Sequence, residues 1–124
     1  MFVLSQDEKN SCKELVRLAK IAKRDDANEG DITVVDIEKL KYTDSEKRLY
    51  QFIYDQSYET LRKMTALMEY GRDNLDHTDS IETIYKGQGE TPTFQTHKAI
   101  SDYLASKSAG SLIAYFEAAE RFFK

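Results

Sequence analysis

A stripe of basic residues near the start of the chain has the types and spacing best suited to binding a partner. Its members are Lys9, Lys13, Arg17, Lys20 and Arg24. Spacings of four, four, three and four residues place them on one face of an α-helix. Like charges at these spacings repel one another, and Glu14 is the acidic residue close enough in the helix to relieve them. Such a stripe is typical of surfaces that meet phosphate groups or an acidic partner.

An acidic segment follows the stripe directly and offers a competing explanation. Residues 9–24 hold six basic residues and one acidic residue, a net charge of +5. Residues 25–46 hold eight acidic residues and two lysines, a net charge of −6. The acidic segment can fold back along the stripe and neutralise it, or both can remain in water. Partner binding is the third alternative, and the sequence leaves all three open.

If a partner binds, we expect an acidic protein before a nucleic acid. The whole chain has 18 basic and 22 acidic residues, and this net charge of −4 is unfavourable for a protein that must neutralise phosphates. The predicted binding residues are Lys13, Arg17, Lys20, Arg24 and Arg72. Arg72 directly follows Gly71, a predicted helix C-cap, where its side chain could bind the free helix carbonyls or an anion.

Two further patterns favour a structural role over a binding role. Residues 44–54 and 58–70 are spaced like a helix-turn-helix, whose second helix would present Arg62, Lys63 and Thr65. Acidic residues lie beside these three, so we favour an ordinary helical hairpin. The aromatic residues Tyr50, Tyr54 and Tyr58 would share a face of a continuous helix. They could stack on bases or anchor a partner, but such a stripe more often forms the half-exposed edge of a core.

The remaining polar clusters fail the spacing tests for metal or catalytic sites. The acidic loop comprises Asp73, Asp76, Asp79 and Glu82, which lack the alternating acceptors and glycine of a calcium loop. His77, His97 and Cys12 lie too far apart for a zinc site, and Cys12 is predicted to be a small buried hydrophobic group. No glycine-rich phosphate loop or nucleophile elbow is present. We therefore predict no cofactor, no metal and no enzymatic activity.

Composition predicts the scaffold that positions these residues. The 124 residues include one Cys, one Pro and five Gly, with 40% apolar and 32% charged residues. These values exclude disorder and argue against a β-sandwich, which needs frequent turn residues. We predict one all-α domain over residues 1–124, a compact irregular or orthogonal bundle of about six helices. A single Cys and the lack of a long apolar run predict a cytoplasmic protein that does not enter membranes.

Local signals predict where the helices begin and end. Capping boxes at Ser5–Glu8 and Thr43–Glu46 begin two helices, the first running to about Arg24. Four more helices follow. The first starts at about Tyr58, with Asp55 or Ser57 as its cap, and ends at Gly71, and the second starts at Asp79 and ends at Gly87. Thr91 and Ser108 begin the last two. The stretch 32–43 fits either a strand or a short helix, and we favour the helix because a lone strand would lack a partner.

Three segments resemble an uncharacterised family of small bacterial helical proteins. They are the run Leu61–Arg72, which contains Ala66-Leu67-Met68 and Gly71-Arg72, the pair Tyr103-Leu104, and the run Leu112–Glu117. The sequence departs from the family pattern at Glu69, at Asp73 and at Ser108–Ser111, which stand in place of an aromatic residue, a Gly and a Pro-containing turn. The resemblance implies a helical fold and supplies no activity.

Taken together, these patterns predict a non-enzymatic interaction or regulatory module. It would bind an acidic partner, or a second copy of the chain, through the basic face of the first helix or through the tyrosine edge. A nucleic-acid-associated regulator using the same stripe is the alternative hypothesis. An enzyme with a site near Arg72 and the acidic loop is a third.

Overall fold

The computed structural model describes residues 2–28, 43–73 and 80–124. These residues form six α-helices and two 3-10 turns and include no strand, which confirms the predicted all-α bundle. The elements are α1 (Gln6–Asn28), α2 (Asp44–Tyr54), α3 (Tyr58–Arg72), α4 (Ile81–Gly89), η1 (Pro92–Phe94), α5 (His97–Ala105), α6 (Ala109–Ala118) and η2 (Glu120–Phe122). The predicted helix within 32–43 lies outside the described residues.

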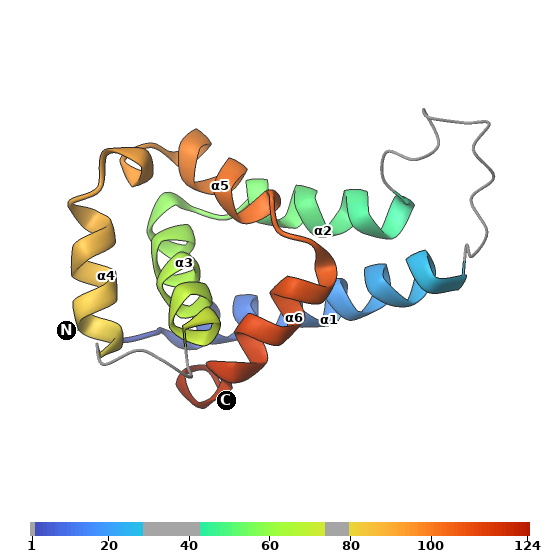
Figure 1. The fold of residues 1–124 in the computed structure, drawn as a ribbon, viewed down its shortest axis with the longest axis horizontal. Coiled ribbons are helices and arrows are strands. Elements are labelled where there is room, and N and C mark those ends of the chain that lie inside the picture. Colours follow the sequence, from blue (N-terminus) through green and yellow to red (C-terminus); the bar gives the residue numbers. More distant parts are fainter. Residues whose placement is uncertain (1, 29–42, 74–79) are drawn as a thin grey trace.

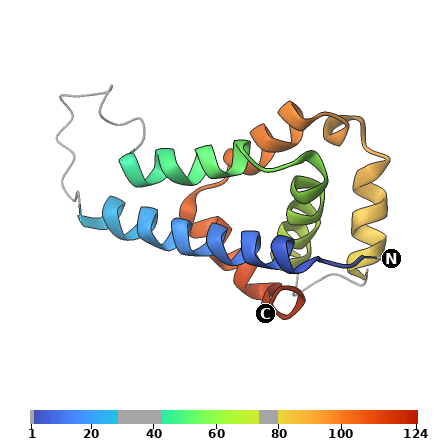
Figure 2. The ribbon, with the colours of Figure 1, turned by 180° about the vertical axis from the view of Figure 1, so that it is seen from behind.

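Helix α1 is the long element on which the bundle is assembled. Helix α2 returns antiparallel beside it, and α6 crosses α1 near the C-terminus (Figures 1 and 2). Helix α3 packs against α6, α4 and α5. Helix α4 lies at one end of the molecule, and the C-terminal end of α1 lies at the other (Figure 1). One buried apolar cluster draws residues from all six helices.

The structure confirms the predicted caps at the starts of α1, α2, α3 and α6. The Ser5 backbone N–H donates to Glu8 Oε1 at 2.8 Å, and the Glu8 N–H donates to Ser5 Oγ at 3.1 Å. Thr43 and Glu46 form the same reciprocal pair at the start of α2. Ser57 caps α3 and Ser108 caps α6, as predicted. These bonds satisfy N–H groups that the first helical turn leaves without a partner.

Several predicted boundaries are wrong, each for a local reason. Helix α1 continues past Arg24 to Asn28. Helix α4 is capped by Ser80 and runs through Gly87 to Gly89, because Gly87 adopts no left-handed conformation that would end it. The helix predicted to start at Thr91 is instead the short turn η1 followed by α5, because the Thr96 side chain accepts a hydrogen bond from the Ala99 N–H and caps a new helix.

Gly71 has a different role from the predicted C-cap. It lies inside α3, which ends at Arg72, and it is buried against α6. A Cβ atom at this position would lie 1.8 Å from the Tyr115 carbonyl oxygen, which belongs to the backbone of α6. Glycine is therefore required because the two helix backbones touch here, and not because the helix turns.

This contact predicts opposite effects for two glycine-to-alanine substitutions. Gly71→Ala forces α3 and α6 apart and should lower the free energy of unfolding by about 3 kcal/mol. Gly87→Ala is the control, since a Cβ there meets no atom within 4 Å. Alanine is the better helix former, so this variant should gain about 0.5 kcal/mol. Urea denaturation followed by circular dichroism measures both, and equal effects would refute the close contact.

Candidate partner-binding surface

The outer face of α1 is set by what its inner face buries. Cys12 is fully buried, as predicted, and so are Leu15, Ala19 and Ala22, whereas Val16 is half-buried. The inner face packs between α2 and α6. Because a helix that is buried along one face presents the opposite face to solvent, the basic residues are left outside.

Four of the predicted binding residues lie together on this outer face, and we call them the basic face. They are Lys13, Arg17, Lys20 and Arg24, and all four are exposed. Lys9, at the start of the predicted stripe, is half-buried. The side chains of Arg17, Lys20 and Arg24 retain 61%, 57% and 68% of their accessible surface.

Carboxylates of the same chain contact three of these cations only at the surface. Arg17 pairs with Glu14 one turn earlier in α1. Lys20 Nζ lies 3.8 Å from Glu117 Oε2 of α6. Arg24 Nε lies 3.7 Å from the neighbouring Asp25 Oδ1. Exposed ion pairs contribute little to stability, so these cations can exchange their partners at small cost.

The competing prediction, neutralisation by the segment 25–46, is answered in part. Residues 29–42 lie outside the described residues. Asp25 contacts Arg24 and accepts a hydrogen bond from Ser45, while Glu46 caps α2. Asp25 therefore lies beside the basic face and can neutralise part of its charge. Glu46 serves instead as a cap of α2.

Arg72 is not part of the basic face. It belongs to α3, and its Nε donates to Asp73 Oδ1 at 3.2 Å while Nη1 donates to the Tyr103 hydroxyl at 3.3 Å. It therefore contacts side chains rather than the helix carbonyls that we predicted. The hydrogen bond to the Asp73 carboxylate raises the pKa of the Arg72 guanidinium above its already high value. The structure thus brings together four of the five predicted residues.

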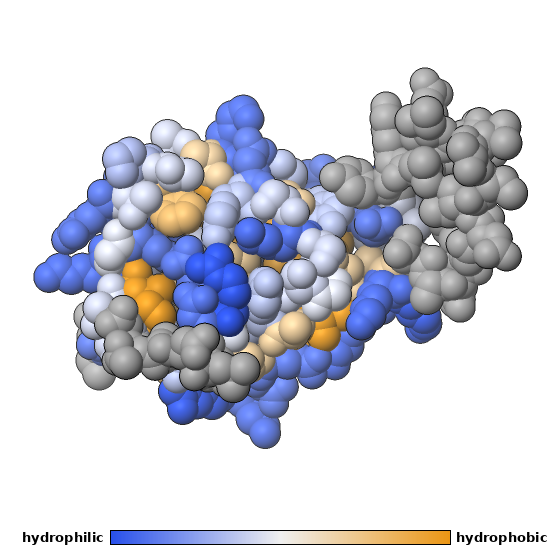
Figure 3. Space-filling model, viewed as in Figure 1, coloured by the Kyte–Doolittle hydropathy of each residue, from blue (hydrophilic) through white to orange (hydrophobic). Residues whose placement is uncertain are grey.

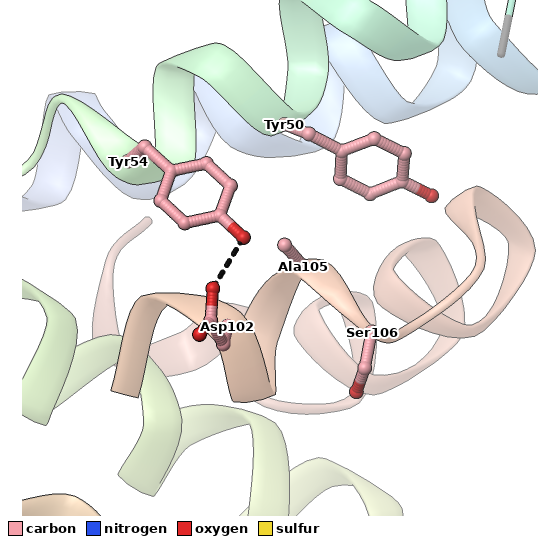
Figure 4. Close-up of a pocket in the computed structure, with 5 residues that line it drawn as sticks. All are labelled: Tyr50, Tyr54, Asp102, Ala105 and Ser106. Carbon is pink, nitrogen blue, oxygen red and sulfur yellow. Dashed lines mark hydrogen bonds between the residues drawn. The ribbon is translucent and has the colours of Figure 1, made fainter. Parts of the chain in front are cut away.

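The tyrosine stripe runs along the edge of the core, with Tyr50 buried, Tyr58 half-buried and Tyr54 exposed. Tyr50 donates to the Lys107 carbonyl at 3.1 Å, Tyr54 to Asp102 Oδ1 at 2.6 Å, and Tyr58 to the Phe94 carbonyl at 2.6 Å. Figure 4 shows the Tyr54 hydroxyl pointing from α2 to Asp102 of α5. These two residues line a hollow of about 260 Å³ together with Tyr50, Ala105 and Ser106. Tyr54 and Tyr58 thus join the α2–α3 hairpin to the η1–α5 segment, and Tyr50 joins α2 to the link between α5 and α6, which favours the structural interpretation.

The three residues that a recognition helix would present also make contacts within the chain. The Arg62 Nη2 donates to the Tyr85 carbonyl at 2.8 Å, and its guanidinium lies over the Tyr85 ring. Lys63 Nζ contacts Glu8 at 2.9 Å, and the buried Thr65 donates to the Leu61 carbonyl. Groups held in this way are not presented to DNA, so the helix pair is better described as an ordinary hairpin.

Cys12 is buried, as predicted. Burial, with a smaller effect from the Glu8 charge, raises the pKa of its thiol to about 12, so that it stays protonated at neutral pH. Across the described ranges 2–28, 43–73 and 80–124, no three His, Cys, Asp or Glu side chains are grouped closely enough to hold a metal ion. Within the same part of the chain, no helix has the length and apolar character to span a bilayer.

Comparison with known proteins yields no match among family models, among curated proteins or among solved structures. The resemblance to a family of small bacterial helical proteins therefore stays a prediction.

The contact between Lys63 and Glu8 was not predicted from the sequence, and it fixes the start of α1 against α3. Both side chains are mostly buried, with 19% and 15% of their surface exposed. Burial by itself would raise the pKa of Glu8. Hydrogen bonds from the Ser5 N–H and from Lys63 outweigh it, so the pKa lies below the usual value. A carboxylate with a lowered pKa stabilises the fold above its titration range, and this stabilisation is lost as the pH falls through the folded-state pKa.

We predict that Lys63→Met lowers the free energy of unfolding by about 1–3 kcal/mol at neutral pH, because it removes the cation that pairs with the mostly buried Glu8 carboxylate. The loss should shrink as the pH falls through the folded-state pKa of Glu8, because a protonated carboxyl group no longer needs a cationic partner. Lys98→Met is the control, since Lys98 pairs with Asp102 at the surface. It should change stability little across the same pH range. A Lys63→Met effect that is independent of pH would contradict the role assigned to Glu8.

Proposed function

We propose that the chain is a non-enzymatic interaction module that binds an acidic protein partner through the basic face of α1. The observation that carries this proposal is the presentation of Lys13, Arg17, Lys20 and Arg24 on one exposed helix face. Their intramolecular ion pairs are exposed and therefore weak competitors for a partner's carboxylates.

The scaffold supports this role because it holds the basic face in a fixed arrangement. The inner face of α1 is buried between α2 and α6, and Glu8 ties its first turn to Lys63. Lys13 and Arg24 are eleven residues apart, which corresponds to about 17 Å along a helix. An acidic segment of about five extended residues covers that length. Because the cations are already arranged along this line, binding requires little ordering of the backbone.

An acidic protein is favoured over a nucleic acid as the partner. The net charge of −4 opposes the approach of a polyanion as a whole, so binding depends on the local basic face. The hairpin residues Arg62 and Lys63, which a helix-turn-helix would direct at DNA, contact Tyr85 and Glu8 instead. Nucleic-acid binding through the same basic face is the alternative that the experiment must separate.

The proposal predicts that binding to a labelled polyglutamate peptide depends on position and not on total charge. The double variant Lys13→Glu/Lys20→Glu should weaken binding at least about tenfold at low salt, as expected when favourable charge contacts become repulsive. The matched control Lys86→Glu/Lys98→Glu changes the net charge equally on exposed residues of α4 and α5. It should retain most of the affinity in fluorescence anisotropy.

Two results would overturn the proposal. Equal losses in both double variants would mean that only net charge matters. Tighter binding of a labelled DNA duplex than of polyglutamate, lost in Lys13→Glu/Lys20→Glu and steeply weakened by salt, would instead establish the nucleic-acid alternative.

A further inference from the structure

A hollow next to the basic face has an apolar floor and a charged rim. It lies between α1 and the last turn of the chain and has a volume of about 200 Å³. Its lining residues are Lys13, Val16, Glu120, Phe123 and Lys124. It therefore joins two elements that are remote in sequence, and it shares Lys13 with the basic face.

The floor of the hollow is anchored in the core. Phe123 is almost fully buried, and its ring lies 6.4 Å from the ring of Phe116, centroid to centroid. Val16 is half-buried on the side of α1 that leads toward the core. An apolar side chain placed here would lose contact with water against groups that do not need to move.

Lys13 supplies positive charge to the rim of the hollow on the side of the basic face. Lys13 also lines a second, shallower hollow with Asn10, Glu14 and Arg17, so one lysine borders both depressions. Lys124 Nζ lies 3.6 Å from Glu120 Oε1, and both side chains are exposed. This pair is easily opened, and Lys124 can then turn toward an incoming carboxylate.

We infer that the segment recognised by the basic face is an acidic peptide with one aliphatic side chain, which enters the hollow beside Val16 and Phe123. This inference rests on the proposed function and adds the identity of the ligand's central residue. Carboxylates next to the aliphatic residue contact Lys13 and Arg17. The rise between these two residues is about 6 Å in a helix, close to the distance between alternate residues of an extended peptide, about 6.6 Å.

The hollow between α2 and α5 does not offer the same combination. The hydroxyl groups of Tyr50 and Tyr54 are bonded to Lys107 and Asp102, and its charged lining residue, Asp102, is acidic. An acidic peptide would be repelled there. Charge complementarity therefore selects the hollow beside Lys13.

Two labelled heptapeptides test the inference on the unmodified protein. Both carry three glutamates on each side of a central residue, which is Leu in one and Ala in the other. The Leu peptide should bind about five times or more tightly, because it buries additional apolar surface. In Val16→Thr, which keeps the shape of the side chain but replaces one methyl group with a hydroxyl group, this preference should fall by at least half. Glu120→Gln should tighten the binding of both peptides by about two- to threefold, because it removes a repulsive charge from the rim.

The outcomes separate the two proposals. Equal affinities for both peptides, with binding still lost in Lys13→Glu/Lys20→Glu, would overturn the inference and leave the proposed function in place. No detectable binding of either peptide at low salt would overturn both. A Leu preference that Val16→Thr leaves unchanged, in a variant with native circular dichroism, would place the aliphatic side chain elsewhere. Light scattering measures whether the chain is a dimer. If the unmodified protein is a dimer and the Val16→Glu variant is a monomer, the hollow is the contact with a second copy of the chain, and the inference is overturned.

Discussion

The packing of α1 between α2 and α6 is the constraint on which the other features depend. Small residues at Cys12, Ala19 and Ala22 allow both neighbours to contact the same long helix, and Leu15 fills the space between them. Once this face is buried, the helical period fixes the opposite face as the exposed one. A row of cations that would be unfavourable in an isolated helix is therefore held in place by apolar burial on the other side.

The polar groups elsewhere in the bundle make this face distinctive. The hydroxyl groups of Tyr50, Tyr54 and Tyr58 each donate to a group between η1 and the start of α6. The side chains of Arg62 and Lys63 contact Tyr85 and Glu8. These contacts join elements that are far apart in the sequence, and each holds a group that could otherwise have bound a ligand. On the face of the molecule seen in Figure 3, hydrophilic residues predominate and apolar residues are gathered in a few separate places. The exposed cations of α1 are held by weaker contacts, which makes them the better candidates for binding.

The features that the sequence predicts well are those that depend on neighbouring residues. The capping boxes at Ser5 and Thr43 and the buried face of α1 follow from hydrogen bonds and periodicity within a few residues. Gly71 was misinterpreted because a left-handed cap and a close helix contact both require glycine, and only the position of Tyr115 distinguishes them. The Glu8–Lys63 contact spans 55 residues, and no local pattern indicates it.

The same reasoning applies to the candidate site. The stripe itself could be predicted because helical spacing determines which residues share a face. Arg72 was grouped with it on the basis of charge, whereas the structure joins it to Asp73 and Tyr103. The hollow beside Val16 could not be predicted, since it is completed by Phe123 and Lys124 from the other end of the chain.

The account's central claim is that the basic face of α1 is the surface that meets an acidic partner. Chemical-shift mapping of the isotope-labelled protein with unlabelled polyglutamate tests it most directly, because it locates the contact without altering a residue. The account predicts that the largest backbone amide shifts fall within 13–24 and in the adjoining last turn of the chain. Shifts that are largest on α4 and α5, or spread evenly over all exposed lysines, would contradict it.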